Sequence, residues 1–156
     1  MHSRIFQISK NPIEPENFIH ESKYYDSFVN YIADYVSTIS TENLEANYEW
    51  LNQLTGLDYN AENKTICVKD KKAYFTNQFN LFKQHLETIQ NTSIETFITP
   101  NLHAQMYSLK SAYDDEYGFY IDDDGEQFGL MTLDDFVRHT TDGDIFYLGA
   151  VIDYHY

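Results

Sequence analysis

The run from Asp122 to Glu126 places four acidic side chains around Gly125 and is the densest group of potential metal ligands in the chain. An EF-hand calcium loop needs glycine at position six and oxygen ligands at positions one and twelve. With Gly125 at position six, those two positions fall on Tyr120 and Met131, so the spacing excludes an EF-hand. Asp124-Gly125 instead predicts a β-hairpin turn with Asp122 to Asp124 exposed. A weak carboxylate site on that turn is the alternative.

Other candidate chemistry is dispersed along the chain. The six histidines form no His-x-x-x-His pair and Cys67 is the only cysteine, so neither a zinc site nor an internal disulfide is indicated. Cys67 lies in an apolar stretch, which favours a small buried side chain over a nucleophile. Asp58 followed by Asp70-Lys71-Lys72 imitates the carboxylates and lysine of metal-dependent nucleases, although Asp70 equally suits a helix cap. No phosphate-binding loop or nucleophile elbow is present, and we predict no catalytic residue, metal or cofactor.

Net charge is the most unusual property of the sequence. The chain carries 25 acids and 10 bases, a net charge of −15. Residues 111–156 hold 12 of these acids and Arg138 as their one base, a net of −11. Such a field repels nucleic acids and anionic membranes and attracts basic proteins. We therefore predict a basic partner protein and no direct binding to nucleic acid or membrane, with a mere solubility bias as the competing interpretation.

The predicted binding surface is built from this acidic third. Its acids stand in or beside predicted turns, where exposure is expected. Carboxylates that converge within a Debye length, about 8 Å at physiological salt, reinforce each other's field. The predicted contact residues are Asp114, Asp115, Glu116, Tyr117, Tyr120, Asp122, Asp123, Asp124, Asp134, Asp135, Asp142 and Asp144.

Helical patterns occupy the middle of the chain. Residues 17–39 fit a helical stripe, although they are rich in β-branched and aromatic side chains, and residues 41–56 fit a helix that ends at Gly56. The clearest helix starts at Asp70, its cap, and two shorter helices follow from 93 and from Pro100. We predict that the stripe of the clearest helix is core; it consists of Phe75, Phe79, Phe82, Leu86 and Ile89.

Strand patterns occupy the two ends. Arg4 to Ile8 predicts the first strand, and Thr65 to Val68 predicts a short one. The segments 117–121 and 127–131 flank the hairpin turn, and a short helix capped by Thr132 follows. Residues 145–152 are apolar throughout and predict an inner strand, with Gly149 as a bulge or a point of close approach.

These patterns predict a single α+β domain over residues 1–156. In it, central helices pack on a mostly antiparallel sheet that is formed by the N-terminal strand and the C-terminal strands. Residues 1–10 lack the apolar core of a signal peptide, and the longest apolar run covers eight residues, far short of the ~20 that cross a bilayer. We therefore expect a soluble, cytoplasmic protein.

The leading interpretation is a non-enzymatic protein-binding module, such as an inhibitor or a nucleic-acid mimic that occupies a basic groove. Two alternatives stay open. The first is a metal-dependent or small-molecule enzyme with a dispersed site drawn from Asp114, Glu116, Asp122, Asp134 and His139. The second is a homo-oligomeric structural protein held together by exposed tyrosines.

Overall fold

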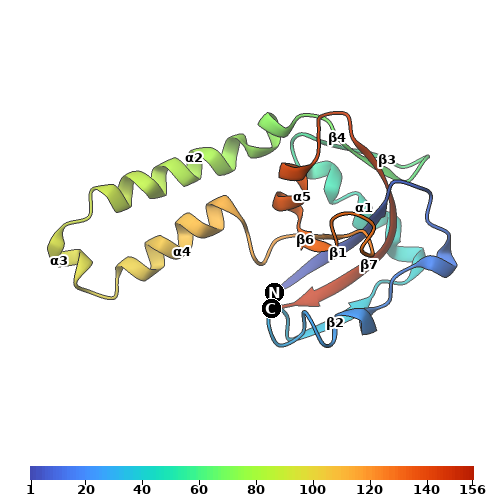
Figure 1. Cartoon of the computed structure of the whole chain (residues 1–156), viewed down its shortest axis with the longest axis horizontal. Helices are drawn as coiled ribbons and strands as arrows, with labels where there is room; N and C mark the ends of the chain where they lie inside the picture. Colours follow the sequence, from blue (N-terminus) through green and yellow to red (C-terminus); the bar gives the residue numbers. More distant parts are fainter.

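Two long strands form the centre of a seven-stranded sheet. In the computed structural model, which describes residues 1–156, β1 (His2–Ser9) lies antiparallel beside β7 (Ile145–His155). β1 also pairs in parallel with β5 (Tyr120–Asp122), which pairs antiparallel with β6 (Leu130–Thr132). The predicted pairing of the first strand with the C-terminal sheet is thus confirmed. Both chain ends lie side by side on this sheet (Figure 1).

The other edge of the sheet is made by the middle of the chain. β7 pairs with β4 (Thr65–Val68), and β4 pairs with β3 (Leu57–Asn60). β2 (Tyr35–Thr38) pairs with the C-terminal end of β7. All pairings except β1 with β5 are antiparallel, so the predicted α+β class with a mostly antiparallel sheet is confirmed.

The central strands are buried on both faces, which explains why β7 reads as a continuous apolar run. Phe6 and Val151 belong to the larger core on one face, whereas Ile5 and Ile152 belong to a second core on the other. Gly149 is a point of close approach, because a Cβ there would lie 2.7 Å from Oε1 of Gln7. That same oxygen accepts hydrogen bonds from the backbone N–H groups of Ile19 and Ala150.

Short turns replace the first two predicted helices. The predicted helix over 17–39 is wrong. The 3-10 turn η1 (Pro15–Asn17) comes first, and the segment then contains the 3-10 turn η2 (Glu21–Tyr24), irregular turns and β2. Its aromatic side chains anchor the second core instead of a helix face. The region 41–56 breaks into η3 (Thr41–Asn43), α1 (Leu44–Tyr48) and η4 (Leu51–Gln53), and it ends at Gly56, whose φ is +85°.

Three helices form an arm that projects from one side of the molecule (Figure 1). α2 (Lys71–Gln90) runs outward, α3 (Ile94–Phe97) turns the chain, and α4 (Leu102–Tyr113) runs back. The side chain of Asp70 caps α2 by accepting from the N–H of Ala73, as predicted. We call residues 71–113 the arm and the remaining residues the body.

The prediction that the α2 stripe is core is wrong. No residue of α2 or α4 is buried, and Phe79 is 60% exposed. Phe75 is half-buried against the larger core, Phe82 and Ile89 are half-buried beside α4, and Leu86 is exposed. A stripe at helical spacing shows which side chains share a face, but it does not show whether a sheet, one helix or solvent covers that face.

The C-terminal elements agree closely with those predicted from the sequence. The antiparallel hairpin of β5 and β6 is confirmed, although its strands are joined by the long loop 123–129. α5 (Leu133–His139) is capped by Thr132, whose hydroxyl accepts from the N–H of Asp135. Phe136 and Val137 place α5 on the larger core.

Candidate protein-binding surface

Several predicted contact residues lie inside the body. Asp122 is fully buried and accepts hydrogen bonds from the Tyr24 hydroxyl, at 2.8 Å, and from Nζ of Lys23, at 2.9 Å. Asp123 is also buried, so the predicted exposure of these two residues is wrong; only Asp124 of the three is exposed. Tyr120 is buried as well and donates its hydroxyl hydrogen to the backbone oxygen of Glu116.

Asp123 organises the loop 123–129. Its carboxylate accepts from four backbone N–H groups of that loop, at 2.6–3.1 Å, on Gly125, Gln127, Phe128 and Gly129. Burial alone would raise the pKa of Asp123, but these hydrogen bonds outweigh it and lower the pKa below its usual value. The acidic run is therefore the support of a loop rather than a free anionic surface.

Asp134 joins α5 to the root of the arm. Its buried carboxylate accepts from the hydroxyl of Tyr74, at 2.8 Å, and from Nε2 of Gln78, at 2.9 Å. Burial is the main cause that raises the pKa of Tyr74, so this phenol stays protonated as a donor. The exposure expected for Asp134 in a turn is therefore wrong.

Most of the other acids in this set already bind a base. Arg138 contacts Asp114 at 3.9 Å and Asp135 at 3.1 Å, and Lys110 contacts Glu116 at 2.7 Å. Ion pairs also join Asp124 to Lys23 and Asp144 to Lys10. The structure thus brings Asp114 and Asp135 together on one arginine, and Asp122 and Asp124 together on one lysine.

Three of the predicted contact residues remain. Asp115 is exposed, Asp142 accepts from the first backbone N–H of α2, and the ring of Tyr117 stacks on Tyr156 at 4.6 Å.

A group of free carboxylates lies elsewhere on the body and was missed from the sequence. Glu42 lies in η3, Glu45 lies in α1 and Glu49 directly follows α1. All three are exposed and have no lysine or arginine within ion-pair distance. Their spacing of three and four residues, which puts them on one helical side, was the signal that could have found them. Glu45 also accepts a hydrogen bond from the hydroxyl of Tyr59.

The arm carries most of the exposed apolar surface. Ile94, Phe97 and Ile98, at its tip, are 64–76% exposed. Further large apolar side chains are exposed along the two long helices: Phe79, Leu81, Leu86, Met106, Tyr107 and Tyr113. The predicted acidic contact set includes none of these residues, and two of them, Phe79 and Leu86, belong to the stripe that was predicted as core.

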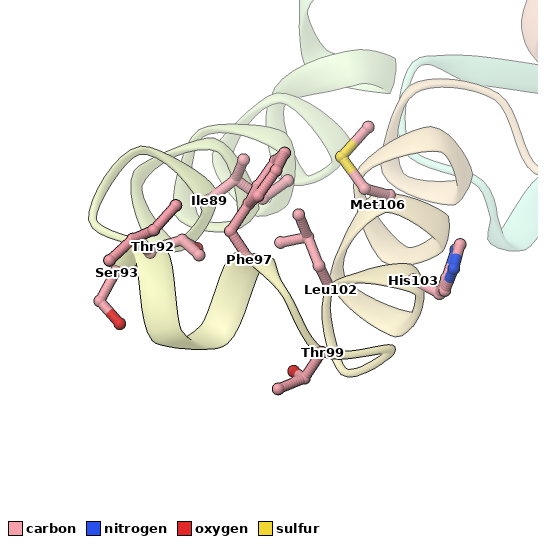
Figure 2. Close-up of a pocket in the computed structure, with 9 residues that line it drawn as sticks. Ile89, Thr92, Ser93, Phe97, Thr99, Leu102, His103 and Met106 are labelled. Atoms are coloured by element: carbon pink, nitrogen blue, oxygen red, sulfur yellow. The ribbon is translucent and has the colours of Figure 1, made fainter.

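A groove of about 910 Å³ opens at the tip of the arm. Figure 2 shows Ile89, Phe97 and Leu102 converging between the helices, with Met106 on the next turn of α4. Polar groups are confined to its margin, where Thr92, Ser93, Thr99 and His103 lie. The groove therefore suits apolar side chains of another chain better than a charged ligand.

The root of the arm is fixed by Arg138. Its guanidinium lies over the rings of Phe75 and Tyr113, 4.9 and 4.1 Å from their centroids, and donates to the backbone oxygen of Tyr113. Lys71 adds two hydrogen bonds to backbone oxygens at the end of α5, on Arg138 and Thr140. The body thus holds the arm at its root, while the outer part of the arm meets solvent (Figure 1).

Charge divides between the two parts of the chain. The arm has four lysines against Glu87 and Glu95, a net of +2. The body keeps the other 23 acids and six bases, a net of −17.

The residues considered for metal or nuclease chemistry do not form a site. No three His, Cys, Asp or Glu side chains gather in a way that could hold a metal ion. Asp58 pairs with Lys69 at 3.8 Å, Asp70 caps α2, and Lys71 is used at the arm root. Burial raises the pKa of the Cys67 thiol, which disfavours the reactive thiolate.

A comparison with family models, with curated proteins and with solved structures finds no match to this chain. None of its helices, α2 included, has an apolar stretch that could cross a membrane.

Proposed function

We propose that the protein is a non-enzymatic protein-binding module with two surfaces: the apolar arm, which contacts other protein chains, and the acidic body, which attracts a basic partner. The observation that carries this proposal is the exposure of large apolar side chains along the arm and at its tip. Single exposed apolar residues are common, but a contiguous patch above a few hundred Å² marks an interaction site. The groove between the helices supplies the concave shape that such contacts use.

Charge supports a basic protein as the partner of the body. With a net charge of −17, the body attracts cations and repels the phosphates of nucleic acids. The free carboxylates of Glu42, Glu45 and Glu49 contribute to this field, since no internal base neutralises them. Association with a basic protein is therefore expected to slow as salt is added.

A dispersed enzyme site has less support. Asp122 is occupied by Tyr24 and Lys23, and Asp134 is occupied by Tyr74 and Gln78. His139 is exposed on the last turn of α5, with Nδ1 2.7 Å from the backbone oxygen of Asp135. These groups serve the fold and do not converge on one cleft.

Affinity capture from host-cell extract, with purified variants as baits, tests the proposal. The Phe97→Ser/Ile98→Ser variant is expected to retain less protein than the native chain at every salt concentration, because it removes apolar contact area at the tip. The Glu42→Gln/Glu49→Gln variant should lose chiefly the proteins that added salt also releases. Tyr31→Ser is the matched control, because Tyr31 is 78% exposed but lies on the body. If the native chain and the three variants captured equal amounts of protein, the proposed binding roles of both surfaces would be refuted.

A further inference from the structure

The exposed apolar side chains of α2 divide between its two edges. Residues seven apart lie almost above one another on a helix, so Phe79 and Leu86 emerge on the same edge. Both are exposed, whereas Phe75 and Phe82 are half-buried and line a cavity together with Ala112 and Tyr113 of α4. Leu81 is 49% exposed and, five residues before Leu86, emerges on the opposite edge.

α4 repeats this arrangement on the same side of the arm. Met106 and Tyr113 are also seven apart and exposed. Phe79 and Tyr113 line one cavity of about 300 Å³ near the root, while Met106 lines the tip groove (Figure 2). The four exposed side chains Phe79, Leu86, Met106 and Tyr113 therefore share one side, which we call the arm face.

We infer that a second copy of this chain covers the arm face, with the two arms packed antiparallel as a four-helix bundle. This inference rests on the proposed role of the arm as a protein-contact surface and names the chain that it contacts. In antiparallel pairing about a two-fold axis, both copies contribute the same surface patch, so the arm face alone forms the whole interface. Helical hairpins with apolar faces pack into bundles in this way.

Charge distribution disfavours contacts between the bodies of two copies. Each body carries −17, so contacts between bodies are repulsive, whereas each arm carries only +2. α2 has 20 residues and spans about 30 Å at 1.5 Å per residue. Antiparallel arms keep the two bodies at opposite ends, more than three Debye lengths of about 8 Å apart. Both acidic bodies then stay uncovered for a basic partner.

The exposed area is sufficient for a stable dimer. At about 200 Å² for each aromatic side chain, the exposed parts of Phe79, Phe97 and Tyr113 amount to about 350 Å². Ile94 and Phe97 line the tip groove together with Met106 and so belong to the same side. The aliphatic side chains Leu86, Ile94 and Met106, which are 45–66% exposed, add roughly 250 Å². The total of about 600 Å² per partner reaches the lower end of standard interfaces, which bury roughly 1,200–2,000 Å² in both partners together.

Sedimentation equilibrium of the purified chain tests the inference. The native chain is expected to sediment as a dimer. Its dissociation constant should fall several-fold when salt is raised from about 0.01 M, where the Debye length is about 30 Å, to about 0.15 M, because salt then screens the repulsion between the bodies. Phe79→Glu/Met106→Glu should sediment as a monomer. Leu81→Glu, on the opposite edge, should remain a dimer. Circular dichroism shows that each variant is folded, and Phe79→Ser/Met106→Ser repeats the test if the charged variant unfolds.

Three results would overturn the inference: a native chain that is monomeric at high micromolar concentration, a dimer that the arm-face variants leave intact, or a dimer that salt dissociates. A monomer whose Phe97→Ser/Ile98→Ser variant still loses captured proteins would reject the second copy as occupant and leave the proposed binding function standing. A dimer whose variants all capture the same proteins as the native chain would support the second copy as occupant and reject the capture of other proteins.

Discussion

Asp122, Asp123 and Asp134 show what decides whether an acid in a turn faces solvent. Each accepts from a buried or half-buried donor that comes from another part of the chain or from the turn itself. A donor that is buried without an acceptor destabilises the fold by about 1–3 kcal/mol. Net charge per segment counts only the bases inside that segment. The net charge of residues 111–156 therefore leaves out Lys10, Lys23 and Lys110, which lie outside that segment and form ion pairs with its acids.

Asp123→Asn is expected to lower the free energy of unfolding by about 2–4 kcal/mol at pH 7, because an amide NH2 group replaces an oxygen that accepts backbone hydrogens. The pKa of Asp123 is lowered by folding, so its stabilisation is complete above the unfolded value of about 3.9 and is lost as the pH falls toward the folded value. Urea unfolding at several pH values should show a constant difference from the native chain above pH ~5 and a shrinking one below pH ~4.

Asp26→Asn is the control for this measurement, since Asp26 is exposed and has no hydrogen-bond or ion-pair partner. Its free energy of unfolding should match that of the native chain to within a few tenths of a kcal/mol at every pH. A difference between native and Asp123→Asn that persists unchanged at low pH would contradict the role given to the charge.

At the scale of elements, Gly56 fixes where the arm leaves the body. Its φ is +85°, and its backbone oxygen accepts from the N–H groups of Lys69 and Asp70 just before α2. A Cβ at this position would lie 2.3 Å from the backbone oxygen of Asp70 and 2.8 Å from the nitrogen of Tyr74. The close approach of this turn to the start of α2 leaves no room for a side chain.

Gly56→Ala is therefore expected to cost about 1–2 kcal/mol for the left-handed backbone and about 1–3 kcal/mol more for the overlap. Gly125→Ala is the matched control: its φ is +83°, but a Cβ there meets no atom within 4 Å, so only the first cost applies. Chemical denaturation of both variants measures the difference. Equal losses would show that the contact between Gly56 and the start of α2 contributes nothing.

The sequence predicted elements well where local signals agree. Asp70 and Thr132 were predicted to cap helices, and both do so in the structure. Gly56 has the predicted left-handed backbone, but it lies in the turn before β3 and not at the end of a helix. The helix predicted over 17–39 failed because tertiary contacts of Tyr24 and Phe28 with the second core outweigh helical periodicity. The prediction that the α2 stripe is core failed for another reason. Periodicity shows which side chains share a helix face, but their burial depends on what packs against that face, and Phe79 is exposed because little packs against it.

At the scale of the molecule, unpaired charge on the body opposes compactness. Like charges at a net of −17 repel one another, and the folded body holds them closer than the unfolded chain does. Glu42→Gln/Glu49→Gln is expected to raise the free energy of unfolding by a few tenths of a kcal/mol at low salt, and added salt should remove the gain. Urea titrations at two salt concentrations check this.

Glu87→Gln is the control, because Glu87 lies on the arm, whose net charge is +2. Removing its charge should not stabilise the chain at low salt. A similar gain from this variant would mean that total charge matters and that its division between arm and body does not.

The pairing of β1 with β7 has a consequence for the order of folding. His2 lies opposite His155, so the central ladder joins residues from nearly opposite ends of the chain. Contacts of such long sequence separation form slowly, because a large loop must close, at a cost in chain entropy, before the contacts stabilise the fold. During synthesis the arm can form its helix–helix contacts early, because its helices are neighbours in sequence; only the contacts of its root with α5 come later. The sheet must wait for its last strand to leave the ribosome. A nascent chain therefore displays the apolar arm before the acidic body has taken shape to keep other chains away.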